Sequence, residues 1–175
     1  MLHAITGTLM WTFDRLLTAT IISLAILAGA ILTSVAAVLV FNVASRLVAG
    51  RNVYGMVDGI ELGIMAATFL AAPWVLMKNA HVRVDLVPRL LGERMRRALE
   101  IATDLLGAAL SAVMCWAAGN SLMLSHARGS LVRGVLALPE WLLLIAPTAG
   151  AALLVAEFLR RVARGHTRDG AATGL

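Results

Sequence analysis

The chain contains an apolar run from Leu16 to Val40 that carries no charged side chain over 25 residues. At a rise of about 1.5 Å per residue, a helix over this run is longer than the roughly 30 Å hydrocarbon core of a bilayer. The small residues Ser34, Val35 and Ala36 resemble a signal-peptide cleavage site. The apolar core of a signal peptide, however, has only about 7–15 residues. We therefore expect this run to remain in the protein as a membrane span.

Three further apolar runs follow, so that the expected spans cover about residues 16–40, 60–77, 99–124 and 141–159. The chain is 60% hydrophobic and only 14% charged, whereas soluble domains average about 25% charged residues. The sequence predicts an all-α integral membrane protein in which residues 1–175 form one four-span domain. We expect long, tilted transmembrane helices, short interfacial helices in the loops, and a disordered tail over 165–175.

The basic residues are distributed unequally between the two sides of such a protein. The segment from Lys78 to Arg97 alone holds six of the fifteen Lys and Arg residues. Together with the two terminal segments, it places eleven of them on one side and four on the other. Positively charged short loops remain in the cytoplasm. We therefore predict a multi-pass protein of a bacterial inner membrane, with both termini and the central loop in the cytoplasm.

The same charge pattern argues against several kinds of site. The arginines lie in short clusters between apolar runs, and not on a basic face with stacking aromatics, so we expect no nucleic-acid partner. The single cysteine, Cys115, has no second thiol to pair with. No histidine falls deep in a predicted span, so a haem held by two histidines would lack ligands. We expect no catalytic, cofactor or metal site, and hence no enzyme.

Two carboxylates, Glu61 and Asp104, lie near the ends of predicted spans. Ionisable residues within spans are candidates for function, but near a helix end they can reach water or pair with an arginine or a partner subunit. Besides a subunit of a larger membrane complex, two other interpretations of the chain remain open. One is a self-sufficient small exporter that uses Glu61 as its proton site, and the other is a membrane anchor for a redox complex.

Several short motifs occur in a characteristic order. A polar segment with Arg46 and Arg51 follows the first span, and Glu61 opens the second. The second span leads into a loop in which a small residue, Ala80, is followed by His81 and by hydrophobic residues at alternate positions up to Asp85. Arginines follow from Arg89, and the last span combines a Pro-aromatic pair with a later proline and glycine, namely Pro139, Trp141, Pro147 and Gly150.

This order resembles the small membrane subunit of the tripartite ATP-independent periplasmic (TRAP) transporters, the DctQ type, from about Phe41 to Arg161. One departure is Leu90-Leu91-Gly92, where many members have a proline. The resemblance implies a non-enzymatic scaffold subunit surrounded by membrane lipid. Its partners would be a large multi-span permease and a periplasmic substrate-binding protein, and the complex would take up a small organic acid using a sodium gradient. The motif residues would then serve subunit contacts or local structure.

Overall fold

The computed structural model describes residues 2–50, 55–78, 93–132 and 138–164. Within these ranges the chain forms four α-helices, each long and apolar enough to cross a membrane. The helices are α1 (Leu2–Ala49), α2 (Met56–Met77), α3 (Glu93–Arg128) and α4 (Glu140–Arg164). The predicted all-α membrane fold is thereby confirmed.

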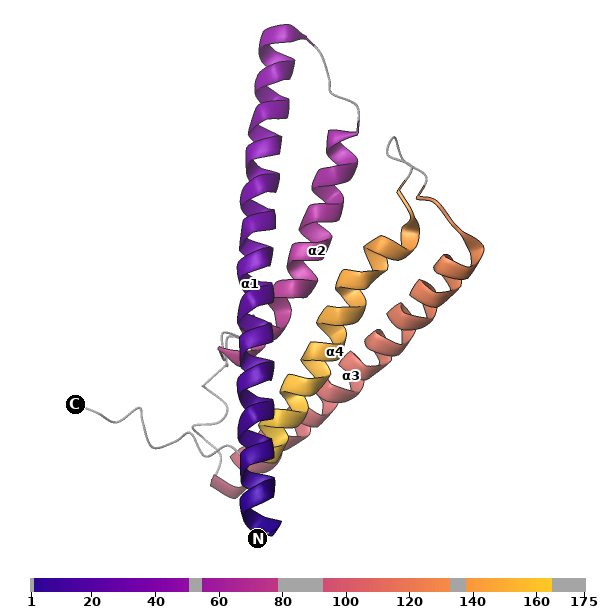
Figure 1. Cartoon of the computed structure of the whole chain (residues 1–175). Helices are drawn as coiled ribbons and strands as arrows, with labels where there is room; N and C mark the ends of the chain where they lie inside the picture. Colours follow the sequence, from indigo (N-terminus) through magenta and orange to yellow (C-terminus); the bar gives the residue numbers. More distant parts are fainter. Residues whose placement is uncertain (1, 51–54, 79–92, 133–137, 165–175) are drawn as a thin grey trace, which may run out of the picture.

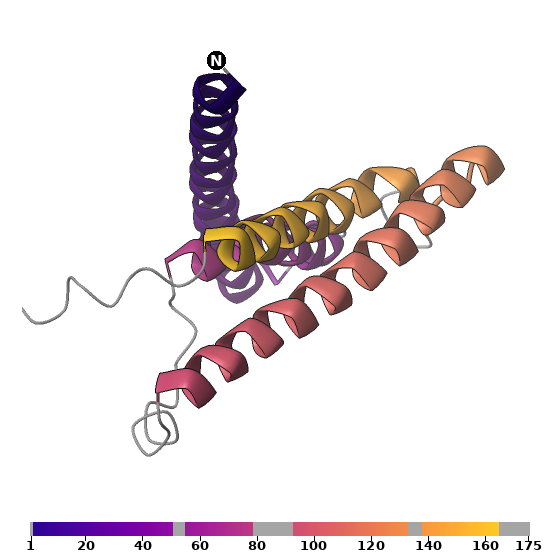
Figure 2. The same cartoon turned by 90° about the horizontal axis from the view of Figure 1, so that it is seen from below.

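The helices form a row, and not a closed bundle. The extensive helix contacts join α1 to α2, α2 to α4, and α4 to α3, so that α1 and α3 are the outer members. Figure 1 shows the starts of α1 and α3 and the end of α4 at the lower end of the molecule, toward which α2 also runs. Figure 2, seen from that end, shows α1 and α3 on opposite flanks of α2 and α4. This is the arrangement expected when the chain crosses a membrane four times.

The helix boundaries differ from the predicted spans in an instructive way. Residues 41–49, expected to belong to a polar connection with its own interfacial helix, instead continue α1 without a break. With 48 residues α1 is about 70 Å long, and its last turns project beyond the start of α2 (Figure 1). No short interfacial helix occurs within the described ranges. The loop helix expected near Asp85 and the tail over 165–175 lie outside them.

Small residues form the contacts between helices, and most large apolar side chains face outward. The buried cluster consists of Ala28 on α1 with Ala67 and Leu70 on α2, and Ala146 of α4 packs against it. In contrast, Leu106 and Trp116 on α3 are 61% and 71% exposed. Helices in lipid usually associate through the close approach of small residues. Burying an apolar side chain there adds no hydrophobic stabilisation, because the lipid tails are themselves apolar. The outward apolar surface is therefore what lipid or a partner helix would cover.

Each of the three helix contacts contains a glycine that leaves no room for a side chain. A Cβ atom at Gly63 would lie 2.5 Å from Val35 on α1, and one at Gly107 would lie 2.5 Å from the ring of Phe158 on α4. Gly150 of α4 is more restricted, because its Cβ would collide with the backbone carbonyl of Phe69 on α2. A side chain can rotate away from such a clash, whereas a helix backbone cannot.

The contact at Phe69 follows from the proline in α2. Pro73 lies inside this helix and is buried. A proline has no N–H, so it cannot donate to the carbonyl of the residue four positions earlier, which here is Phe69. The freed carbonyl faces Gly150, and the absence of a side chain there lets the two backbones approach. A Cα–H of glycine can satisfy such an oxygen in part. Pro73 and Gly150 thus form one packing unit in the middle of the row.

Candidate functional site

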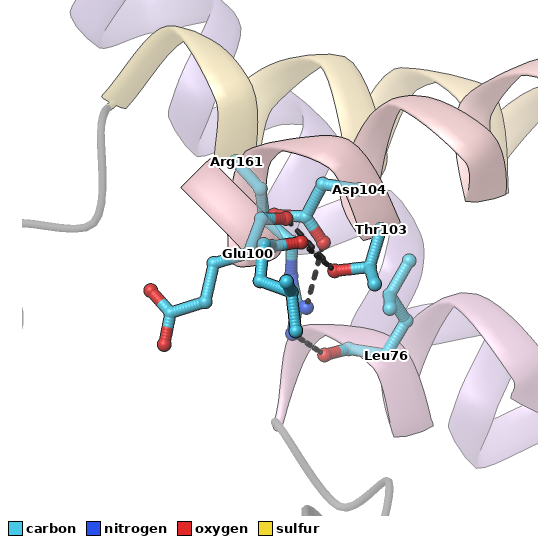
Figure 3. Close-up of polar contacts among 6 residues, drawn as sticks. Leu76, Glu100, Thr103, Asp104 and Arg161 are labelled. Carbon is cyan, nitrogen blue, oxygen red and sulfur yellow. Dashed lines mark hydrogen bonds and ion pairs between the residues drawn. The ribbon is translucent and has the colours of Figure 1, made fainter. Parts of the chain in front are cut away.

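A cluster of polar residues joins the helices at the lower end of the molecule; we call it the arginine cluster. It consists of Thr18, the Leu76 carbonyl, Asp104, Glu157, Arg160 and Arg161. Figure 3 shows Arg161 reaching from α4 between Asp104 on α3 and Leu76 on α2. The Arg161 Nη2 group donates to the Leu76 carbonyl. Its Nη1 atom lies 3.7 Å from Asp104 Oδ1, an ion pair without a hydrogen bond.

The contact with Leu76 has a clear physical basis. Leu76 is in the last turn of α2, where carbonyl groups have no partner within the helix. A positive charge is also favourable there, because the C-terminal end of a helix carries a partial negative charge. Arg161 thus satisfies an acceptor on one helix and neutralises a carboxylate on another, which ties α2, α3 and α4 together.

Arg160, the next residue on α4, extends the arginine cluster to α1. Its Nη1 atom donates to Thr18 Oγ1 at 2.8 Å, and its Nη2 atom lies 2.5 Å from Glu157 Oε2. The Glu157 residue is only 2% exposed, so its charge needs this partner. Two adjacent arginines of one helix therefore hold contacts to all three other helices.

The carboxylates of the arginine cluster are largely withdrawn from solvent. Asp104 is 7% exposed, and its Oδ2 atom has no hydrogen-bond donor among the described residues. The sequence left open whether Asp104 reaches water or pairs with an arginine, and in the structure it pairs with Arg161. The arginine pair itself escaped sequence reasoning, because Arg160 and Arg161 were counted only as charges that set topology. The sequence did contain a signal for this pairing. Arg160 and Arg161 follow Glu157 by three and four positions, so they lie on the same helix face as this otherwise isolated acid.

A second polar group closes the connection between α3 and α4 at the opposite end. Leu131 and Pro139 form an antiparallel bridge, with Glu140 N–H donating to the Ser130 carbonyl at 3.0 Å. The Ser125 hydroxyl donates to Glu140 Oε2 at 3.2 Å. The ring of Trp141 meets His126 edge to face at 5.4 Å. The Pro-aromatic pair thus belongs to the connection between α3 and α4.

The predicted site residues do not come together. Arg46 is exposed near the end of α1, and Glu61 is exposed in the second turn of α2, later than the first turn expected for it. Pro147 and Gly150 are buried inside α4. The remaining candidates, Arg51, His81, Asp85 and Arg89, lie outside the described residues. Within the described part of the chain, no group of three or more His, Cys, Asp or Glu side chains could hold a metal ion.

Comparison with known proteins gives one match. No curated protein matches the chain significantly. The family model of the DctQ component of the tripartite ATP-independent periplasmic transporters matches residues 35–168, which is most of the chain. This match covers the end of α1, all of the later helices and both polar groups described above except Thr18. The family is one of transporter components, and not of enzymes. The chain belongs to the DctQ family, the small membrane subunits of TRAP transporters.

Proposed function

We propose that this subunit is a scaffold for a sodium-gradient-driven importer of a small organic acid. It would associate in the inner membrane with a large multi-span permease, which carries substrate and sodium. A periplasmic binding protein would deliver the substrate. The observation that supports this most is the pairing of the two buried carboxylates with arginines of the same chain. Asp104 pairs with Arg161 and Glu157 with Arg160, so these charges serve to join helices and are not available to line a path for ions.

The experiment that tests this proposal compares the chain alone with the complete complex. We expect the tagged full-length chain to co-purify with a much larger membrane protein. Vesicles that contain the chain alone should take up no substrate when a sodium or proton gradient is imposed. Uptake should appear once the large subunit and the binding protein are present. Transport by the chain alone would contradict the scaffold role.

We further propose separate structural roles for the motif residues. Glu61 is exposed near the start of α2, whereas Leu76 of the arginine cluster is in its last turn. It would pair with an arginine, either Arg51 or one on the large subunit. Asp85 would cap a helix in the central loop, with His81 and Arg89 holding that loop at the headgroups. Glu61 and the loop cannot form one site, because a span of about 30 Å separates them.

For the orientation, we propose that the end with the arginine cluster faces the cytoplasm. Met95 near that end and Leu131 near the other are both 57% exposed and uncharged, so they form a matched pair. In a chain without Cys115, Leu131→Cys should react with a membrane-impermeant thiol reagent in intact spheroplasts, and Met95→Cys should react only after lysis. The opposite labelling pattern would reverse the orientation.

A further inference from the structure

The exposed surface of α3 near its start combines two arginines with an apolar stripe. Arg94 and Arg97 are exposed, in contrast to Arg160 and Arg161, which are partly buried and hold the helices together. The segment Glu93–Arg97 contains three arginines and one glutamate. Glu100, one turn later, points away from Arg161 in Figure 3 and is partly buried. The exposed charge at this place is therefore mainly positive.

The apolar stripe continues directly from these arginines along the same side of the helix. Residues spaced three, four or seven positions apart share a helix face. Ile101 is four positions after Arg97 and seven after Arg94, and Leu105 follows one turn later. Ile101 is 36% and Leu105 50% exposed. Asp104 and Ala108, which follow on the same side of α3, are buried, so the stripe lies along the edge of the contact between α3 and α4, where its side chains remain exposed.

The arginine cluster fixes the depth of this surface in the membrane. Two members of the cluster have an exposed basic residue close to them in the sequence. Arg15 is three residues before Thr18 on α1, and Lys78 is two residues after Leu76, just beyond the end of α2. The boundary of the hydrocarbon core therefore lies near the level of Asp104. Arg97 precedes Asp104 by about 10 Å along the axis of the tilted helix α3, which places it within the headgroup layer beyond the core. Ile101 and Leu105 lie at the margin of the core.

We propose that this surface is a binding site for an anionic phospholipid. The guanidinium groups of Arg94 and Arg97 would bind the lipid phosphate, for which the fork of an arginine is well suited. One acyl chain would lie along Ile101 and Leu105. A mixed surface with cations at headgroup depth and apolar side chains directly below matches the two parts of such a lipid. The site does not depend on the transported substrate or on the scaffold role proposed above.

The test is native mass spectrometry of the purified full-length chain, titrated with phosphatidylglycerol or phosphatidylcholine. We expect tighter binding of phosphatidylglycerol, and a loss of roughly 10- to 30-fold in Arg94→Gln/Arg97→Gln, the factor expected for two basic residues at an anionic surface. The matched control is Arg46→Gln/Arg128→Gln, which removes two exposed arginines from the other end. It should leave binding unchanged. Lysine at both positions 94 and 97 should retain the preference for phosphatidylglycerol but lose part of the affinity, because an ammonium group keeps the charge and lacks the fork.

Three results would overturn the proposal. In the first, Arg94→Gln/Arg97→Gln binds phosphatidylglycerol as tightly as the native chain. In the second, phosphatidylcholine binds equally well, or free glycerol phosphate displaces the lipid at equal concentration, which would indicate a site for soluble phosphate. In the third, lipid binding is unchanged and the variant instead loses co-purification with a larger membrane protein. The surface would then contact a subunit and not a lipid.

Discussion

Replacing Gly150 with alanine is expected to lower the free energy of unfolding by about 1–3 kcal/mol, the usual cost of overpacking. The added Cβ atom would meet the Phe69 carbonyl, which belongs to the backbone of α2 and cannot rotate away. The separation of α2 and α4 would have to increase along the middle of the row. Reversible unfolding in mixed micelles, followed by tryptophan fluorescence, measures the change.

The chain offers matched controls for this substitution. A Cβ at Gly119 would lie 3.9 Å from Thr148, an ordinary contact, and one at Gly29 would meet nothing within 4 Å. Alanine at either position should leave stability unchanged or raise it, since glycine inside a helix costs about 0.5–1 kcal/mol relative to alanine. Alanine at Gly107 should fall between these cases, because the Phe158 ring can shift. Equal effects at Gly150 and Gly119 would refute the close contact with α2.

Replacing Arg161 with leucine is expected to have the larger effect, a loss of about 3–5 kcal/mol, because Asp104 would remain as a buried charge without a partner. The double variant Arg161→Leu/Asp104→Leu should recover most of that loss, since an apolar pair of this kind is often as stable as the buried ion pair that it replaces. Arg128→Leu, at an exposed position, is the control and should change stability by less than about 0.5 kcal/mol.

The same unfolding measurement on the native, the two single-variant and the double-variant chains forms a double-mutant cycle. A coupling free energy near zero between Arg161 and Asp104 would show that the 3.7 Å separation is not an effective interaction. In that case the contact of Arg161 with the Leu76 carbonyl would carry the effect of the single substitution. Asp104→Leu should lower the free energy of unfolding by less than Arg161→Leu, because Arg161 keeps its contact with the Leu76 carbonyl when Asp104 is absent. Equal losses in the two variants would contradict this assignment.

The number of spans could be predicted from the sequence, because long uncharged runs have no other stable environment than a membrane. Residues 99–124, the predicted third span, lie within α3, which begins at Glu93. The end of α1 was not predicted, because the polar segment after the first span was expected to be a connection with its own short interfacial helix. Polar side chains mark the end of the membrane-spanning part of a helix, but they do not end the helix itself. With 48 residues, α1 is longer than the hydrocarbon core is thick and continues beyond it.

The contacts between helices were beyond sequence reasoning for a different reason. Small residues at helical spacing occur on several faces of these helices, so their pattern does not say which helix packs on which. Pro73 and Gly150 each suggested a local irregularity, but their pairing depends on the angle between α2 and α4. Likewise, a charge count treats Arg161 as one of eleven equivalent residues, although only its position beside Leu76 and Asp104 distinguishes it.

The contact at Gly150 and the contacts of Arg161 have a mechanical consequence when they are considered together. Both connect α4 to α2, and they are eleven residues apart along α4, which corresponds to about 16 Å. A single point of contact would allow the α1–α2 pair to rotate in any direction relative to the α3–α4 pair. Two points at this separation act as a hinge with a fixed axis, and the extension of the arginine cluster to Thr18 on α1 blocks rotation about that axis as well. The four helices should therefore rotate and tilt in the membrane as one rigid body.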